Sequence, residues 1–218
     1  MTYGHRSGDR GRRPFVRPAD DPPGTSRLFV AVPVAVEVRE AVGRLMEQLA
    51  GAPVDVRAPG QPRWVNVEGL HLTLRFLGAT PDVRIQELSV AVAAAAAGVA
   101  PFRIELTGGG AFPDPTRPRV LWIGIGTGVA ELRALERRLD VALQRLGWAG
   151  DERPLQPHLT LARTDGVPGA DLKARHLIDL ARDVRLDWQA ESLILYKSNV
   201  VRGPTHYEAL STARLGAD

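Results

Sequence analysis

The sequence His71-Leu72-Thr73-Leu74 returns unchanged at residues 158–161, and this repeated tetrapeptide decides how the rest of the chain is interpreted. Successive side chains point to opposite faces of a β-strand, so each histidine shares a face with the threonine two positions later. The leucines are natural core residues, which directs each His and Thr to the opposite face. If two lobes carry the two copies and a pseudo-twofold axis relates them, the polar faces meet in one groove.

The residues around each copy predict the same series of elements, with matching elements about ninety residues apart. In each half a short apolar strand precedes an amphipathic helix, the extended motif segment and a second helix. Strands are expected at residues 28–32, 70–77, 102–106, 120–125, 157–162, 184–188, 193–196 and 207–210, and helices at 34–51, 81–99, 129–146 and 171–181. This series predicts two α+β lobes of similar plan, packed across a cleft.

The first 26 residues differ from the rest, because they are mostly Gly, Arg, Pro and Asp with almost no apolar pattern. Such a segment buries too little apolar surface to fold. We therefore expect a disordered tail over residues 1–26 and a folded domain over residues 27–218. The arginines of the tail could add loose affinity for RNA, although a solvated extension without a specific role is the simpler interpretation.

Composition excludes several classes of protein. The 218 residues include no cysteine, which removes disulfides, thiol nucleophiles and cysteine metal ligands. No window approaches the roughly 18 apolar residues of a membrane span, and the N-terminus lacks the apolar core of a secretory signal. A cytoplasmic protein is therefore expected. The formal charge is only +3, but arginine greatly outnumbers lysine, and its planar fork of donors suits phosphate contacts.

Two imidazoles and two hydroxyls on one surface suit phosphodiester hydrolysis. This reaction needs a base that takes a proton from water and an acid that protonates the departing oxygen. Imidazole, with a pKa near 6.5, supplies both forms near neutral pH, and each proton transfer is typically worth about 10²–10⁴-fold in rate. The hydroxyls of Thr73 and Thr160 can donate to the phosphate oxygens. The sequence therefore indicates His71 and His158 as an acid–base pair.

Two other interpretations of these histidines compete with catalysis. A single His on a strand is more often a satisfied polar residue, but packing would not require the same His-x-Thr in both halves. His5, His176 and His206 stand in no repeated context and receive that plain interpretation. A catalytic zinc site usually has three protein ligands, and no H-E-x-x-H or clustered Asp/His set accompanies the pair, so no metal or other cofactor is expected.

Longer segments around the motifs resemble those of the two-histidine phosphoesterase superfamily, and more narrowly the RNA 2′,3′-cyclic phosphodiesterases, also labelled 2′-5′ RNA ligases. The resemblance runs from Arg27 to about Leu210, and the segments that carry it are residues 27–32, 64–78, 110–113, 117–122, 157–163 and 193–198. It implies a bilobal fold with antiparallel sheets lining a central groove and helices outside. It also implies hydrolysis of a terminal cyclic phosphate to a 2′-phosphomonoester, with His71 as the acid, His158 activating water, and both threonines binding phosphate.

Two arginines are secondary candidates for substrate binding. Arg75 continues the alternation of His71 and Thr73, so it should point into the groove and could pair with phosphate. Arg163 matches the family motif but falls on the leucine face by strict alternation, so the strand must end or twist there. Phe76, Phe112 and Trp122 could stack on a base, but each fits a core role equally well and is not assigned.

Three functions remain open from the sequence. The first is hydrolysis of RNA 2′,3′-cyclic phosphate ends or cyclic nucleotides by a monomeric enzyme that does not bind membranes. The second is 2′-5′ RNA ligation at the same site, with a 5′-hydroxyl attacking instead of water. The third is a nucleotide- or RNA-binding module without turnover, which would not need two imidazoles able to exchange protons.

Overall fold

The computed structural model describes residues 22–51, 61–150, 154–165, 167–199 and 206–216. Strand β1 begins at Thr25, slightly before the domain boundary expected at residue 27. Of the tail expected over residues 1–26, residues 1–21, with His5, lie outside the described residues. No helix in the described part of the chain is both long and apolar enough to cross a membrane.

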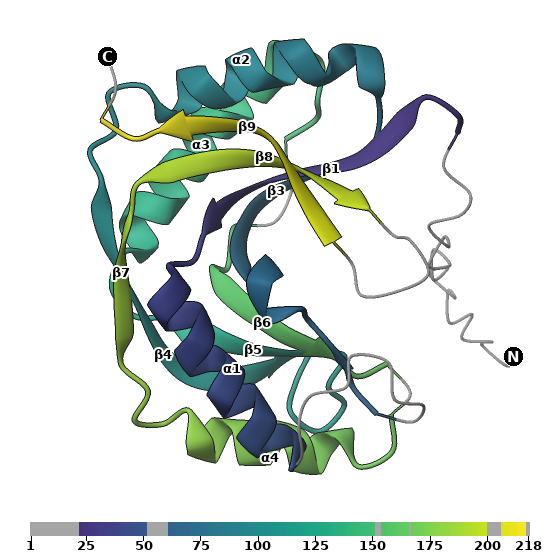
Figure 1. Cartoon of the computed structure of the whole chain (residues 1–218), viewed down its shortest axis with the longest axis vertical. Coiled ribbons are helices and arrows are strands. Elements are labelled where there is room, and N and C mark those ends of the chain that lie inside the picture. The colour runs from purple at the N-terminus through teal and green to yellow at the C-terminus, as the bar shows by residue number, and fades with distance from the viewer. Residues whose placement is uncertain (1–21, 52–60, 151–153, 166, 200–205, 217–218) are drawn as a thin grey trace, which may run out of the picture.

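Two antiparallel sheets form the centre of the molecule (Figure 1). Sheet A has the strand order β3-β1-β8-β9, with β1 at Thr25–Pro33, β3 at His71–Pro81, β8 at Ser192–Asn199 and β9 at His206–Arg214. Sheet B has the order β2-β6-β5-β4-β7, with β2 at Arg63–Trp64, β4 at Phe102–Phe112, β5 at Val120–Ile125, β6 at His158–Arg163 and β7 at Leu186–Ala190. The expected α+β fold with antiparallel sheets is confirmed, and each sheet contains one copy of the motif.

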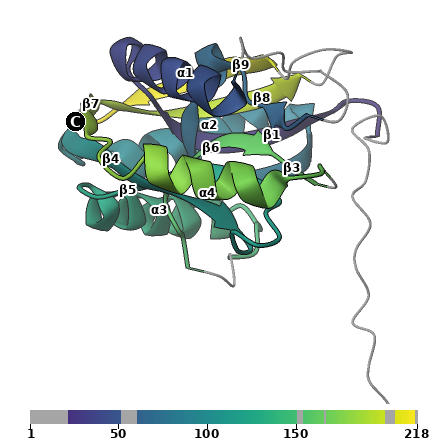
Figure 2. The ribbon, with the colours of Figure 1, turned by 90° about the horizontal axis from the view of Figure 1, so that it is seen from below.

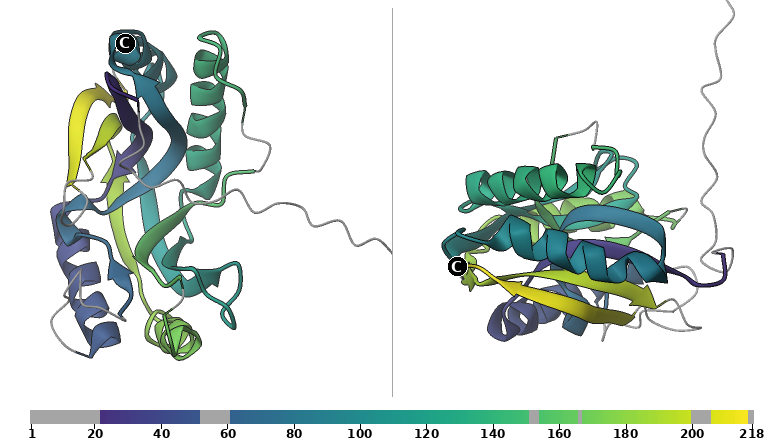
Figure 3. Two further views of the ribbon diagram at one scale, coloured as in Figure 1. Left: turned by 90° about the vertical axis from the view of Figure 1, so that its right-hand side faces the viewer. Right: turned by 90° about the horizontal axis from the view of Figure 1, so that it is seen from above.

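The helices are exchanged between the two sheets. Helix α1 (Val36–Ala50) follows β1 of sheet A but packs against α4 (Ala170–Leu180) and β7 on the side of sheet B. Helix α3 (Val129–Gln144) follows β5 of sheet B but packs against α2 (Ile85–Ala96) and β3 on the side of sheet A. Figure 2 shows α1 and α4 from below, and Figure 3 shows α2 and α3 from above. The two halves thus share a plan, but each depends on a helix from the other.

Helix α1 shows why the spacing of apolar residues predicts the helices of this protein well. Its apolar stripe turns inward, and the buried residues are Val38, Val42, Leu45, Met46 and Leu49. The helix ends where Gly51 takes a left-handed conformation with φ of 75°, and the Gly51 N–H donates to the carbonyls of Glu47 and Gln48. Glycine adopts this conformation without a steric penalty, and the helix expected over residues 34–51 therefore ends close to its expected bound.

Several predicted elements have different bounds in the structure, and two of these differences have a clear local cause. The helix expected from residue 81 begins only at Ile85, because Asp82–Arg84 form a 3₁₀ turn. The strand expected at residues 102–106 continues to Phe112. Its register against β5 shifts between Thr107 and Gly109, and Gly108 at this shift has a φ of 64°. A strand with such a bulge in a glycine-rich stretch does not show the simple alternation by which strands are predicted.

Candidate active site

The motif strands β3 and β6 lie close together, with some of their Cα atoms within 8 Å of each other. The four motif leucines are at most 5% exposed, whereas His71, Thr73, His158 and Thr160 are all half-buried. The alternation inferred from the sequence therefore holds within both tetrapeptides. We call the face of each strand that carries His and Thr its motif face.

Both histidines are held in the same way by the backbone. His71 Nδ1 lies 2.6 Å from the carbonyl oxygen of Gly69, and His158 Nδ1 lies 2.7 Å from the carbonyl oxygen of Gln156. A carbonyl can only accept, so Nδ1 must carry the proton in both rings. The neutral form of each imidazole therefore has an unprotonated Nε2, which is the atom available for proton exchange.

Aromatic rings from sheet A surround His71. The ring centroids of Phe29 and Tyr207 lie 4.7 and 4.9 Å from that of His71, and Tyr196 lies at 6.0 Å. Tyr207 can approach because residue 69 is a glycine, where a Cβ would stand 2.8 Å from Tyr207 Cδ2. The sequence analysis predicted neither tyrosine as a neighbour of the site. For Tyr196 a signal was present, because the buried Leu193 and Leu195 place it on the opposite face of β8.

His158 has its own aromatic neighbours in sheet B. The centroid of Phe112 lies 4.9 Å from that of His158 in an edge-on arrangement, and Trp122 lies at 6.3 Å. Trp122 lies across Gly110, where a Cβ would stand only 2.3 Å from Trp122 Cζ2. From the sequence, Phe112 and Trp122 could belong either to the core or to the site. In the structure both are half-buried neighbours of His158.

Burial lowers the pKa of both histidines, and this is the larger effect at each. The hydrogen bonds from Nδ1 to the Gly69 and Gln156 carbonyls act in the opposite direction. Arg163 lowers the pKa of His158 further, because a nearby cation disfavours the imidazolium form. Both rings are therefore mainly neutral at neutral pH in the free protein, and a bound phosphate anion would favour protonation.

A bulge after each motif decides where the two candidate arginines point. In β3, Thr73 pairs with Ala31 and Arg75 with Val30, so Leu74 is an extra residue. In β6, Thr160 pairs with Trp122 and Ala162 with Leu121, so Leu161 is an extra residue. An extra residue reverses the alternation beyond it. The residue four positions after each histidine therefore turns to the leucine face, and the next one turns to the motif face.

The prediction that Arg75 points to the motif face is consequently wrong. Arg75 is only 7% exposed and forms an ion pair with Asp140 of α3, with Nη1 and Oδ1 3.2 Å apart. It also donates a hydrogen bond to the carbonyl of Ala149. The motif-face position belongs to Phe76, which is 67% exposed and whose ring lies 6.1 Å from that of Phe29.

Arg163 reaches the motif face because of the second bulge. Its side chain is exposed, and its charge acts on both His158 and Tyr207. Tyr207 of sheet A contacts His71. Arg163 of sheet B is therefore close both to His158 and to a neighbour of His71. The twist that strict alternation required at Arg163 is thus provided by the bulge.

Further arginines stand at the Arg163 end of β6. Arg63 is its neighbour in the register of β2 against β6. Asp165 accepts from Arg119 at 2.7 Å and from Arg63 at 3.4 Å. Arg117, Arg119 and Asp165 line an adjacent hollow of about 440 Å³. This end of the strand presents more guanidinium groups than carboxylates, which is a favourable surface for phosphate groups.

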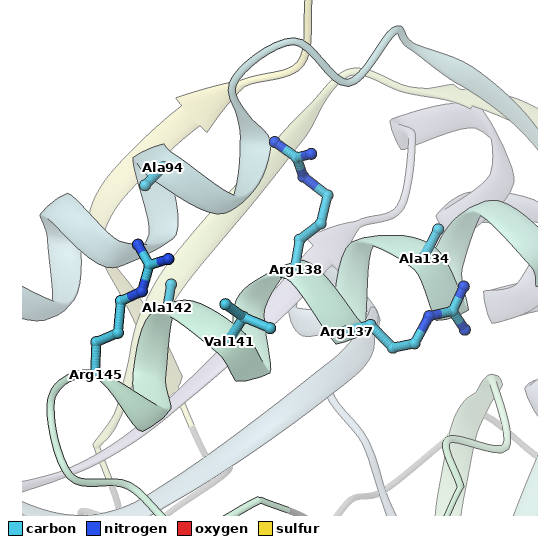
Figure 4. Close-up of a pocket in the computed structure, with 7 residues that line it drawn as sticks. All are labelled: Ala94, Ala134, Arg137, Arg138, Val141, Ala142 and Arg145. Carbon is cyan, nitrogen blue, oxygen red and sulfur yellow. The ribbon is translucent and has the colours of Figure 1, made fainter.

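A different hollow, of about 490 Å³, lies between α2 and α3 (Figure 4). Helix α3 meets the leucine face of β3, where Arg75 and Asp140 pair, so this hollow lies on the side of sheet A away from His71. One of its lining residues, Arg138, donates to the carbonyls of Ala95 and Ala97 at 2.8 and 2.6 Å. Arg138 therefore caps the C-terminal end of α2.

The polar groups around the histidine pair do not resemble a metal site. Within the described ranges, no three His, Cys, Asp or Glu side chains are grouped closely enough to hold one metal ion together. The polar groups that contact or influence the two histidines are instead the backbone carbonyls of Gly69 and Gln156 and the guanidinium of Arg163.

Each of the two antiparallel sheets carries one His-x-Thr motif, and the two motif strands lie close together. This arrangement defines a two-histidine phosphoesterase. The sequence matches the 2′-5′ RNA ligase superfamily over residues 40–202. The chain belongs to this family.

Relatives by sequence carry a more specific description. An RNA 2′,3′-cyclic phosphodiesterase of Aeropyrum pernix is 32% identical over 167 residues, which cover 76% of this chain and 90% of the relative. An RNA 2′,3′-cyclic phosphodiesterase of Geobacillus stearothermophilus is 33% identical over 193 residues, which cover 88% of this chain. The match spans 58% of the length of the Geobacillus protein.

Solved structures share the fold. A crystal structure from Thermus thermophilus superposes with a TM-score of 0.69 at 28% identity, covering 88% of this chain and 99% of that one. A crystal structure of E. coli LigT complexed with 3′-AMP superposes with a TM-score of 0.65 at 25% identity, with the same coverage of 88% and 99%.

Proposed function

We propose that this protein hydrolyses the 2′,3′-cyclic phosphate at an RNA end to a 2′-phosphomonoester, with His71 and His158 as its acid–base pair. The observation that carries the proposal is the identical setting of the two imidazoles. Each begins a motif strand and donates from Nδ1 to a backbone carbonyl two residues earlier, which leaves Nε2 for proton transfer. The RNA 2′,3′-cyclic phosphodiesterases among the relatives support the substrate.

In the proposed reaction a water oxygen attacks phosphorus and the bond from phosphorus to O3′ breaks. One imidazole accepts the proton of the water at Nε2, and the other donates its Nε2 proton to O3′. His158 suits the role of base, because the neighbouring Arg163 disfavours its protonated form. His71 is then the acid, protonated when the anionic substrate raises its pKa.

Other side chains have supporting roles in this proposal. Thr73 and Thr160 share the motif faces with the histidines and donate to the non-bridging oxygens. Arg163 pairs with phosphate, and Arg75 has no direct role, because it lies on the opposite face of β3. Phe76, exposed on the motif face, is suited to stack on a base. The protein is expected to act as a cytoplasmic monomer on RNA or cyclic nucleotides.

One assay tests the proposal: turnover of a 2′,3′-cyclic nucleotide and a cyclic-ended oligonucleotide in EDTA, compared with His71→Ala and His158→Ala. We expect a 2′-phosphorylated product from the unmodified protein, and loss of most activity in each variant while its circular dichroism spectrum is preserved. Activity that EDTA abolishes would indicate a metal site instead. Binding without turnover would indicate a nucleotide- or RNA-binding module.

The matching family is named the 2′-5′ RNA ligase superfamily, so ligation is the second candidate. An RNA 5′-hydroxyl would replace water as the nucleophile at the same phosphorus, and the same two histidines would move the protons. Adding a 5′-hydroxyl oligonucleotide to the assay distinguishes the two reactions. We expect hydrolysis to dominate, because water is abundant and a second RNA end is scarce.

A further inference from the structure

The two motif strands have different neighbours on their outer edges. Strand β6 is flanked by β2, where Trp64 pairs with Ala162 and the Val65 N–H donates to the Leu161 carbonyl at 2.8 Å. Strand β3 is the last strand of sheet A, and no other strand in the described ranges pairs with its free edge. Strand β3 is held by backbone hydrogen bonds to β1 on one side only, so no ladder fixes it on its free side.

Arg75 provides a side-chain contact from β3 at the position where β6 has backbone pairing with β2. Arg75 and Ala162 are equivalent residues, each four positions after the histidine of its motif. Ala162 meets Trp64, in the segment that leads into the first motif. Arg75 donates to the carbonyl of Ala149, in the segment that leads into the second motif. Where β6 has backbone pairing with β2, β3 thus has the guanidinium of Arg75 bound to the Ala149 carbonyl.

The ion pair with Asp140 fixes this guanidinium further. Arg75 is 7% and Asp140 17% exposed, and Nη1 lies 3.2 Å from Oδ1. Asp140 belongs to α3, the helix that leaves sheet B and covers sheet A. The bulge at Leu74 points Arg75 toward this helix. One side chain therefore joins the strand of His71 to the helix and the segment that precede His158.

We infer that Arg75 is a positioning residue, whose guanidinium, held by Asp140 and the Ala149 carbonyl, sets the separation of β3 and β6 and hence of His71 and His158. This inference rests on the proposed function, because that reaction requires both Nε2 atoms to reach one phosphate together. Arg75 does not contact the substrate, since it lies on the leucine face of β3. A misplacement of about 1 Å in such an arrangement can cost about 10²-fold in rate.

The test measures kcat and KM on a 2′,3′-cyclic nucleotide for Arg75→Met, Arg75→Lys and Asp140→Asn. All assays are run well below the melting temperature of each variant. Arg145→Met is the matched control, because Arg145 is an exposed arginine just after α3, away from the motif faces. We expect Arg75→Met to lower kcat about 10²-fold with KM nearly unchanged, Arg75→Lys to recover part of the loss, and Arg145→Met to match the unmodified protein.

Coupling between the two partners gives a second readout. If Arg75 acts through Asp140, the double variant Arg75→Met/Asp140→Asn should lose no more kcat than Arg75→Met alone. Should Arg75→Met fail to fold, Asp140→Asn and Arg75→Lys still decide the matter. An unchanged kcat in both of them would overturn the inference, and so would a raised KM with unchanged kcat, since that result would place residue 75 against the substrate.

The inference can also fail separately from the proposed function. If the unmodified protein shows no turnover, the proposed function fails, and NMR titration of His71 and His158 with inorganic phosphate takes the place of kinetics. One phosphate held between correctly placed imidazoles raises the pKa of both. We expect Arg75→Met and Asp140→Asn to weaken this joint response, and an identical response in the variants would contradict the positioning role.

Discussion

Gly110→Ala would place a methyl group against the indole ring of Trp122. The new Cβ would stand 2.3 Å from Cζ2 and 2.4 Å from Cη2. Carbon atoms pack comfortably from about 3.5 Å, so the ring must move away by about 1 Å. Overpacking of this kind costs about 1–3 kcal/mol, which for a chain of this length lowers the melting temperature by about 2–12 °C.

The same displacement should reach the chemistry, because Trp122 packs against Phe112, and both rings lie beside His158. We expect kcat on a 2′,3′-cyclic nucleotide to fall about 10- to 100-fold, measured by steady-state kinetics below the melting temperature. Gly98→Ala is the control. Gly98 has a φ of 65° and open space around its Cβ position, so alanine there should destabilise by about 1–2 kcal/mol without touching the site.

Two results would refute this reasoning. A Gly110→Ala protein with unchanged melting temperature and unchanged kcat would mean that the ring of Trp122 does not lie across residue 110. Equal losses of kcat in Gly110→Ala and Gly98→Ala would mean that lower stability alone reduces activity.

The remaining predictions concern the charges and the aromatic surface of the site. The pKa of His71 and His158 is lowered in the folded protein, so the unfolded chain binds more protons below about pH 6.5, and the free energy of unfolding should fall as pH falls through this value. Thermal melts at several pH values should show a smaller decrease in melting temperature for His71→Gln and His158→Gln. An equal decrease in the variants and the unmodified protein would contradict this prediction. Arg163→Gln should raise the pKa of His158 in an NMR titration and weaken phosphate binding about 10- to 100-fold; an unmoved His158 pKa would place Arg163 away from the ring. Phe76→Ala should raise KM for cyclic-ended RNA about tenfold while the melting temperature barely changes, since the ring is 67% exposed; an unchanged KM would remove Phe76 from the base-binding surface.

Much of the fold and the histidine pair could be predicted from the sequence, because both depend on local alternation. Leucines at every second position of 71–74 and 158–161 require a buried face, and the opposite face of His and Thr follows from strand geometry. Helix α1 and its end at Gly51 were equally accessible, since the period of the apolar residues and the left-handed glycine are local properties.

The position of Arg75 could not be predicted in this way. Its side chain changes faces because Leu74 is an extra residue relative to β1, and a bulge is a property of two strands and not of one sequence. The same holds for Arg163, where strict alternation placed the side chain on the leucine face. The aromatic neighbours of His71 come from three separate strands, so only the folded sheet brings them together.

The exchange of α1 and α3 between the sheets has a consequence for how the proposed substrate would reach the histidines. A protein whose halves each carried their own helices could open like a hinge around a single crossing point. Here two helices cross in opposite directions, so the halves are tied twice and swinging them apart would expose the apolar faces of both helices. The arrangement of the two motif strands should therefore be in place before substrate arrives, and binding should need no opening of the two halves.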